Sequence, residues 1–409
     1  MQISLDLYQT AAVGVLALLL GMFLTSRLSF LKRFCIPAPV SGGVLFSLIS
    51  LLLYSIVGIE FSFDAILKDV CMMIFFTSVG FQSNLTVLKQ GGKPLIMMVL
   101  LVVVIIFCQN LLSVGISFGM GLDPLFGMCA GSIPMSGGHG TAGGFSPVLE
   151  SLGVEGAASI TMAAATFGLV AGSLIGGPIA ERLIRKKKLK PESGAEMKDS
   201  MASLEVNEVS PEARKPYNHS DEDAFLAFSK AVFLIIIAMG LGSLLSRLLA
   251  LTGITFPTYF GSLIVAALMR NLSELSPSLK AIKTDKIVSI GNICLSLFLG
   301  MAMVSLRLWE LADLALPLLI MLLTQILFLG LFAAFVAFPL LGKDYDAAVL
   351  TSGICGFGLG ATPNAMANMS AVCYKYSYSV KPFVIVPLVG AMFVDIINTA
   401  VITLFLNLL

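Results

Sequence analysis

The sequence predicts an all-α polytopic membrane protein of about ten transmembrane helices, with two re-entrant glycine-rich hairpins in two inverted-topology repeats. Three observations predict this fold: the composition, ten long apolar runs, and a weak internal repeat. Of the 409 residues, 57% are hydrophobic and 12% are charged, whereas soluble domains average about 25% charged residues. The mean hydropathy is +0.96. The expected surroundings are therefore the lipid bilayer, with no nucleic-acid partner.

The apolar runs give the transmembrane spans. A hydrocarbon core of about 30 Å requires roughly 20 apolar residues in a helix. Suitable runs cover residues 9–29, 38–58, 66–86, 94–118, 157–183, 226–250, 256–272, 285–306, 312–340 and 382–408. The segments 123–150 and 344–373 are also apolar, but glycine and proline interrupt them too often for one crossing helix. These two segments are the predicted re-entrant hairpins.

The basic residues predict the orientation. With the loop "RLIRKKKLKPESG" on the cytoplasmic side, only Lys68, Arg247 and Arg307 of the 25 basic residues fall outside. Such asymmetry is typical of cytoplasmic loops. Both termini are therefore expected on the outer side of the membrane, opposite the cytoplasm. The charged segment 184–224 is poor in aromatic residues, which indicates a flexible cytoplasmic linker.

An offset of about 220 residues aligns similar segments of the chain. "FCIPAPVSGGVLFSLI" then pairs with "ITFPTYFGSLIVAALM", and "DPLFGMCAGSIPMSGGHGTA" pairs with "DAAVLTSGICGFGLGATPNA". The predicted organisation is a first repeat at 1–183, the linker at 184–224, and a second repeat at 225–409. Each repeat holds five spans and one broken segment. Because five is odd, the second repeat is expected to have inverted polarity.

Paired broken segments in inverted repeats indicate the binding site of a secondary transporter. Glycines allow the backbone to approach a ligand and to direct N–H groups at an anion, and helices starting after the loops would add their positive ends. We expect two site loops, at 136–141 and 356–368. Helix-packing glycine is the alternative for each loop. The candidate substrate-binding residues are Ser136, Gly137, Gly138, His139, Gly140, Thr141, Gly356, Gly358, Gly360, Ala361, Thr362 and Asn364.

Oxygen-bearing residues near the second broken segment are candidates for a Na⁺ site. They are Asn364, Asn368, Asp395 and Asn398. A carboxylate in the middle of a span, such as Asp395, normally faces a site or a partner. The alternative for Asp395 is a structural bond to a neighbouring helix. His139 could contact substrate or the opposing loop, or make a structural hydrogen bond to another residue.

Other polar or small residues within the spans favour structural roles. Gly168, Gly172 and Gly176 form a GxxxGxxxG pattern that is typical of close helix packing. Interhelical hydrogen bonds are the preferred interpretation for Gln109, Asn110, Asn292 and Gln325. For Arg307 we prefer an interfacial position over a role as a substrate counter-ion.

The cysteines and the remaining polar residues indicate no chemistry of another class. Seven cysteines occur without a CxxC pair, so neither a metal site nor a disulfide framework is expected. The spans contain no Ser/Lys or paired-Asp motif, and we expect no enzyme activity and no cofactor. Two unlike loops also provide no ring of equivalent carbonyls, which disfavours an ion channel.

The motifs "GSIPMSGGHGTAGGFS", "LSLFLGMAMVSLRLWELADLALP" and "GICGFGLGATPNAMANM" resemble those of bacterial sodium/glutamate symporters over nearly the full length. The resemblance implies a homodimer in the inner membrane that imports L-glutamate with Na⁺ as coupling ion. It also implies an elevator-like motion, with Ser136 to Thr141 and Gly356 to Asn364 as the site loops. "PM" at 134–135 and "AGGFS" after Thr141 depart from the family pattern. A Na⁺-coupled symporter of another di- or tricarboxylate is the alternative.

Overall fold

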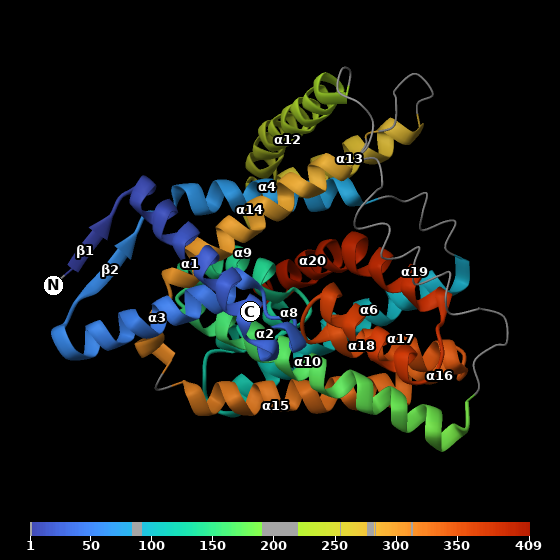
Figure 1. The fold of residues 1–409 in the computed structure, drawn as a ribbon. Helices are drawn as coiled ribbons and strands as arrows, with labels where there is room; N and C mark the ends of the chain where they lie inside the picture. Colours follow the sequence, from blue (N-terminus) through green and yellow to red (C-terminus); the bar gives the residue numbers. More distant parts are fainter. Residues whose placement is uncertain are drawn as a thin grey trace.

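The computed structural model describes residues 2–83, 92–189, 220–253, 255–275, 282, 284–311 and 314–409. Within these ranges the chain is mainly helical (Figure 1), and a helix occupies each of the ten predicted spans. A short parallel sheet pairs β1 (Gln2–Leu5) with β2 (Glu60–Phe63), which the sequence did not predict. The predicted linker at 184–224 lies for the most part outside the described residues.

The helices follow the chain in two similar series. The first half contains α1 (Leu7–Arg27), α2 (Ser29–Arg33), α3 (Ala38–Val57), α4 (Ile66–Gln82), α6 (Gly92–Gly119), α7 (Pro124–Met128), α8 (Ser132–Met135), α9 (Gly138–Ser151) and α10 (Ala157–Lys187). The second half contains α12 (Ser220–Ala250), α13 (Phe260–Leu275), α14 (Asp285–Val304), η2 (Leu308–Leu311), α15 (Ala315–Phe332), η3 (Ala333–Ala337), α16 (Phe338–Leu340), α17 (Tyr345–Gly358), α18 (Thr362–Lys375), α19 (Val380–Val389), η4 (Gly390–Val394) and α20 (Asp395–Leu406).

Eight of the described helices are long and apolar enough to cross a membrane. The two other predicted spans, 66–86 and 256–272, are α4 with 17 residues and α13 with 16 residues. At 1.5 Å per residue these helices are about 26 and 24 Å long. The start of α13 is delayed because a turn, closed by the bond from Phe260 N–H to Pro257 O, precedes it.

The helices form two bundles. The first bundle contains α1, α3, α4, α12, α13 and α14, and the second contains α6 to α10 and α15 to α20. Figure 1 shows α4, α12 and α13 together at the top, with α15 along the opposite side of the molecule. Each bundle thus takes helices from both halves of the chain.

Glycines set the closest helix contacts of the first bundle. A Cβ atom on Gly21 of α1 would lie 1.8 Å from the Ala38 carbonyl of α3, and one on Gly261 of α13 would lie 2.2 Å from the Gly242 carbonyl of α12. Only a residue without a side chain permits such approach. The α1–α3 and α12–α13 pairs therefore pack in the same way in the two halves.

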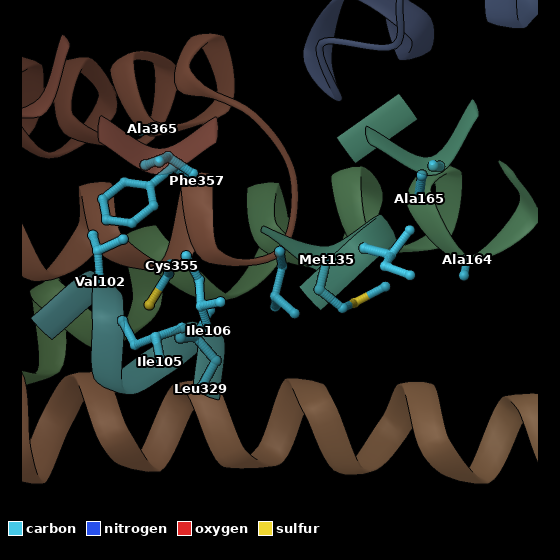
Figure 2. Close-up of a cluster of buried hydrophobic side chains, with 14 of the residues drawn as sticks. Val102, Ile105, Ile106, Met135, Ala164, Ala165, Leu329, Cys355, Phe357 and Ala365 are labelled. Atoms are coloured by element: carbon cyan, nitrogen blue, oxygen red, sulfur yellow. The ribbon is translucent and has the colours of Figure 1, made fainter. Parts of the chain in front are cut away.

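The core of the second bundle is apolar and fully buried. Figure 2 shows Val102 and Ile105 of α6 facing Cys355 and Phe357 of α17, with Leu329 of α15 close by. The exposed fraction of each of these side chains is 2% or less. This packing fixes α17, the first helix of the second broken segment, against α6 and α15.

Candidate functional site

Both broken segments consist of helices separated by short breaks. In the first segment α8 ends at Met135 and α9 begins at Gly138, so only Ser136 and Gly137 lie between them. In the second, Leu359 to Ala361 separate α17 from α18. The expected loops 136–141 and 356–368 are thus mostly helical, which corrects the sequence interpretation. Burial explains this, because backbone groups at these depths must be paired within the protein.

The two breaks meet at a pair of glycines. Gly138 has a φ of +60°, a left-handed conformation that favours glycine. A Cβ atom on Gly138 would lie 3.0 Å from the carbonyl oxygen of Gly360. The start of α9 and the end of the second break are therefore in direct contact.

Gln109 of α6 connects the two broken segments. Its Nε2 donates a 2.6 Å hydrogen bond to the Gly358 carbonyl at the end of α17. Its Oε1 accepts a 2.6 Å hydrogen bond from the Ser136 hydroxyl. Gln325 of α15 donates in turn to the Gln109 carbonyl at 2.8 Å and to the Ser113 hydroxyl at 2.6 Å. The prediction of interhelical hydrogen bonds is confirmed for both glutamines.

A cavity of about 340 Å³ lies between the two bundles at the breaks. Most of the predicted site residues line it: Ser136, Gly137, Gly138, His139, Gly140, Thr141, Gly360, Ala361, Thr362, Asn364 and Asp395. The first bundle contributes the opposite wall, which includes Phe75, Gln82 and Asn292. This wall was not predicted from the sequence, although a polar residue such as Asn292 within an apolar span is a weak signal of it.

Four predicted site residues do not line the cavity. A Cβ atom on Gly356 would lie 2.4 Å from the Ala365 Cα, which places Gly356 at the α17–α18 contact. Gly358 accepts the bond from Gln109. The Asn368 amide donates to the Gly172 carbonyl at 2.9 Å, and the Asn398 amide donates to the Ser132 carbonyl at 3.1 Å.

His139 lines the cavity and is anchored by α10. Its Nε2 lies 2.9 Å from the Thr166 hydroxyl, which itself donates to the Met162 carbonyl. Because a hydroxyl has a single hydrogen, the Thr166 oxygen acts as acceptor and His139 Nε2 as donor. The expected structural hydrogen bond of His139 is therefore present, and it occupies one of the two ring nitrogens.

Several oxygen atoms around the breaks have no hydrogen-bond donor within the described residues. They are Asn364 Oδ1, Asn398 Oδ1 and Thr141 Oγ1, which are buried, and the Asp395 carboxylate, which lines the cavity. A Cβ atom on Gly137 would lie 2.5 Å from both Thr141 Oγ1 and Asn398 Nδ2. The side chains of Thr141 and Asn398 therefore converge at the first break. Buried oxygens without donors are rare in proteins, and such oxygens are suitable ligands for a hard cation.

The glycine pattern of α10 fixes the second broken segment. A Cβ atom on Gly168 would lie 2.4 Å from the Leu359 carbonyl, and one on Gly176 would lie 2.2 Å from the Asn368 amide nitrogen. Asn364 also donates to the Leu169 carbonyl at 2.8 Å. The prediction that these glycines form a close packing face is confirmed.

Arg307 lies away from the cavity. Its Nη2 is 2.9 Å from Glu60 Oε1, and 47% of its side chain is exposed. Glu60 belongs to β2, so the ion pair ties the end of α14 to the short sheet. Arg307 therefore does not face the cavity as a substrate counter-ion would, and its interfacial position stays a prediction.

A helical fold with eight helices able to cross a membrane, and with a cavity between two bundles that is bordered by broken helices, is typical of the class of secondary membrane transporters. Residues 3–378 match the family model described as sodium/glutamate symporter. The chain is 40% identical to the sodium/glutamate symporters of Escherichia coli K12 and Shigella flexneri over 406 residues, 99% of this chain and 98% of each relative. It is 37% identical to that of Haemophilus influenzae over 402 residues, 98% of this chain and 97% of the relative.

The chain belongs to the sodium/glutamate symporter family. This membership confirms the resemblance deduced from the sequence motifs. It also confirms the prediction of a transporter rather than an enzyme.

Proposed function

We propose that this protein imports L-glutamate together with Na⁺. Membership of the symporter family supports this function, and the cavity at the two breaks is the observation that carries it. Glutamate has a net charge of −1, so the membrane potential opposes its entry. Each cotransported Na⁺ adds about 2.3 kcal/mol of inward driving force per 100 mV. Coupling to Na⁺ therefore supplies the free energy that uptake of an anion against the membrane potential requires.

The substrate carboxylates bind at the starts of α9 and α18. The first N–H groups of a helix have no partner within the helix, and the helix dipole makes this end favourable for anions. Gly138 and His139 in the first turn of α9, and Thr362 in that of α18, line the same cavity. Two helix ends directed at one cavity suit a ligand that has two carboxylates. The Asp395 carboxylate provides a counter-charge for the ammonium group or for Na⁺.

Na⁺ binds among the unpaired oxygens near the breaks. Asp395 begins α20 directly after the π-helix η4, and π-helical turns are frequent at functional sites. The orphaned oxygens of Asn364, Asn398 and Thr141 supply neutral ligands. Asn368 remains a candidate only through its side-chain oxygen, because its amide nitrogen is already bonded.

The two halves are inverted repeats, and the broken segments are re-entrant hairpins. The α1–α3 and α12–α13 contacts use glycines at Gly21 and Gly242, which are related by the offset of about 220 residues. The offset also relates the contact of Gly43 with Met303 to that of Gly80 with Leu263. The repeats span 1–183 and 225–409, with both termini on the outer side of the membrane and 184–224 in the cytoplasm.

Transport proceeds by an elevator motion of the second bundle against the first. The second bundle contains both breaks, so it holds the substrate, while the first bundle closes one wall of the cavity. The contact between them places Gly143 and Gly144 of α9 against the rings of Phe298 and Tyr259. Glycines facing flat rings provide a surface without side-chain obstacles to sliding. The active form is a homodimer in the bacterial inner membrane, with the first bundle as the static part.

Uptake of radiolabelled L-glutamate into proteoliposomes tests this function. We expect accumulation with an inward Na⁺ gradient and none when K⁺ or a proton gradient replaces it. Unlabelled di- and tricarboxylates should compete poorly, and strong competition would favour the alternative substrates. Uptake that ignores the Na⁺ gradient would refute the proposal.

A matched pair of glycine variants tests the location of the site. Gly138→Ala should raise the half-saturating glutamate concentration at least about tenfold, because its Cβ atom enters the contact with Gly360 and strains a φ of +60°. Gly115→Ala, on α6 where a Cβ atom meets open space, is the control. Equal affinities in the two variants would place the substrate elsewhere.

A further inference from the structure

A second and larger cavity of about 880 Å³ forms a groove between α10 and the helix formed by α15, η3 and α16. Its walls are apolar over most of their length, with residues such as Leu174 and Ile179 on α10 and Leu327 and Phe335 on the facing helix. Neither the proposed transport function nor membership of the symporter family accounts for this groove. The groove is also separate from the transport site, because no residue lines both cavities.

The charge of the groove is confined to one end. Arg182, Lys186 and Lys187 line the last turns of α10, and none of the lining residues is acidic. Lys187 Nζ lies 5.4 Å from the centroid of the Phe338 ring. The neighbouring carboxylate of Glu181 pairs with Lys375 at 2.7 Å and Arg185 at 3.8 Å. Within the described part of the chain, the three groove cations therefore have no carboxylate partner.

The shape of the groove comes from three backbone features. Gly330 leaves space opposite Ile179, since a Cβ atom there would meet only Ile179 Cδ1, at 3.5 Å. The π-helix η3 at Ala333–Ala337 widens the facing helix just before Pro339, whose missing N–H perturbs the helix ahead of it. These features leave an open apolar channel that leads to the cluster of basic side chains.

We propose that this groove binds an anionic phospholipid. Its phosphate pairs with Arg182, Lys186 and Lys187, and an acyl chain lies between α10 and α15. Both helices are long and apolar enough to cross the membrane, so the walls face the hydrocarbon. Basic pockets between such helices are suited to acidic headgroups. A second copy of the chain is disfavoured, because the same groove provides no carboxylate for an isologous contact.

Native mass spectrometry of the purified full-length protein with added phosphatidylglycerol tests the proposal, with phosphatidylcholine as the neutral comparison. The test variant is Arg182→Gln/Lys186→Gln. The control is Arg185→Gln/Lys188→Gln, which removes the same charge from the same helix end but outside the groove. We expect phosphatidylglycerol to bind the test variant about 30-fold more weakly than the wild type, at about fivefold for each charge lost. The control should differ from the wild type less than about threefold.

A second pair of variants blocks the groove without changing charge. Gly330→Phe places a ring in the channel, whereas Gly177→Phe on α10 faces open space and does not line the groove. Phosphatidylglycerol binding should be lost in the first and kept in the second. Equal losses in the two charge variants, equal binding of phosphatidylcholine, or unchanged binding by Gly330→Phe would each overturn the proposal. All three readouts are independent of glutamate uptake, so they separate this site from the transport function.

Discussion

Replacing Gln109 by leucine would disconnect the two broken segments from each other. The substitution removes two hydrogen bonds of 2.6 Å, to the Gly358 carbonyl and from the Ser136 hydroxyl. It leaves the carbonyl and the hydroxyl buried without another hydrogen-bond partner in place of Gln109. The bonds accepted by the Gln109 main-chain carbonyl remain, because they do not involve the side chain.

The size of the effect follows from the number of bonds lost. Leaving a buried polar group unpaired costs about 1–3 kcal/mol, while side-chain hydrogen bonds between membrane helices average about 0.6 and reach about 1.7 kcal/mol. When both ranges of free energy are doubled for the two bonds, they overlap at about 2–3 kcal/mol. If this free energy holds the two breaks in their binding arrangement, glutamate affinity falls about 30- to 150-fold.

Gln325→Leu is the matched control for Gln109→Leu. Gln325 is also buried and its side chain also makes two hydrogen bonds, both as donor, but neither goes to the broken segments. Melting temperatures in detergent should fall by similar amounts in the two variants. In proteoliposome uptake assays, the KM for glutamate should rise only for Gln109→Leu. A KM that is unchanged in Gln109→Leu, or raised equally in both, would refute the reasoning.

Three further predictions concern the cation, the packing and the motion. Asp395→Asn should raise the half-saturating Na⁺ concentration for uptake at least about tenfold, because the cavity loses its carboxylate; an unchanged Na⁺ dependence would contradict this. Gly168→Ala should destabilise the protein by about 1–3 kcal/mol, since its Cβ atom would lie 2.4 Å from a carbonyl of the second break, and Gly115→Ala in the same melting assay should not. The single tryptophan, Trp309, stacks on Tyr54 at 4.2 Å between ring centroids in the connection between the bundles. Its emission should therefore change on adding glutamate with Na⁺, and identical spectra would argue against movement of that connection.

The local part of the fold was predictable from the sequence. Ten apolar runs became ten helices, and the breaks at Gly137 and Gly360 lie where glycine density is high. The length of an apolar run and the density of glycine can both be read from a short stretch of sequence, without knowledge of distant contacts. The pairing of β1 with β2 was missed, because two four-residue strands separated by three helices have no comparable signal. The division of the helices into two bundles was not predicted either, because it depends on contacts between helices that are far apart in the sequence.

The site was predictable on one wall only. Residues of the glycine-rich segments line the cavity as expected, because the breaks themselves form it. Phe75 and Gln82 on the other wall belong to an ordinary apolar span, and nothing near them in the sequence distinguishes them from packing residues. The interpretation of Asn368 shows a related limit. An amide near a break could be a ligand or a structural donor, and only its contact with Gly172 reveals the second role.

The mixed origin of the bundles has a consequence for how the chain matures in the membrane. During synthesis α1, α3 and α4 enter the bilayer long before α12, α13 and α14. The contact of α1 with α3 lies within the first half, but the contacts of α3 with α14 and of α4 with α13 and α14 require the later helices. Until then Gly43 and Gly80, which later face Met303 and Leu263, are covered only by lipid. Helix association in lipid depends on close packing at such small residues. The α1–α3 pair is therefore expected to form within the first half, and the first bundle is completed only after translation of the second half.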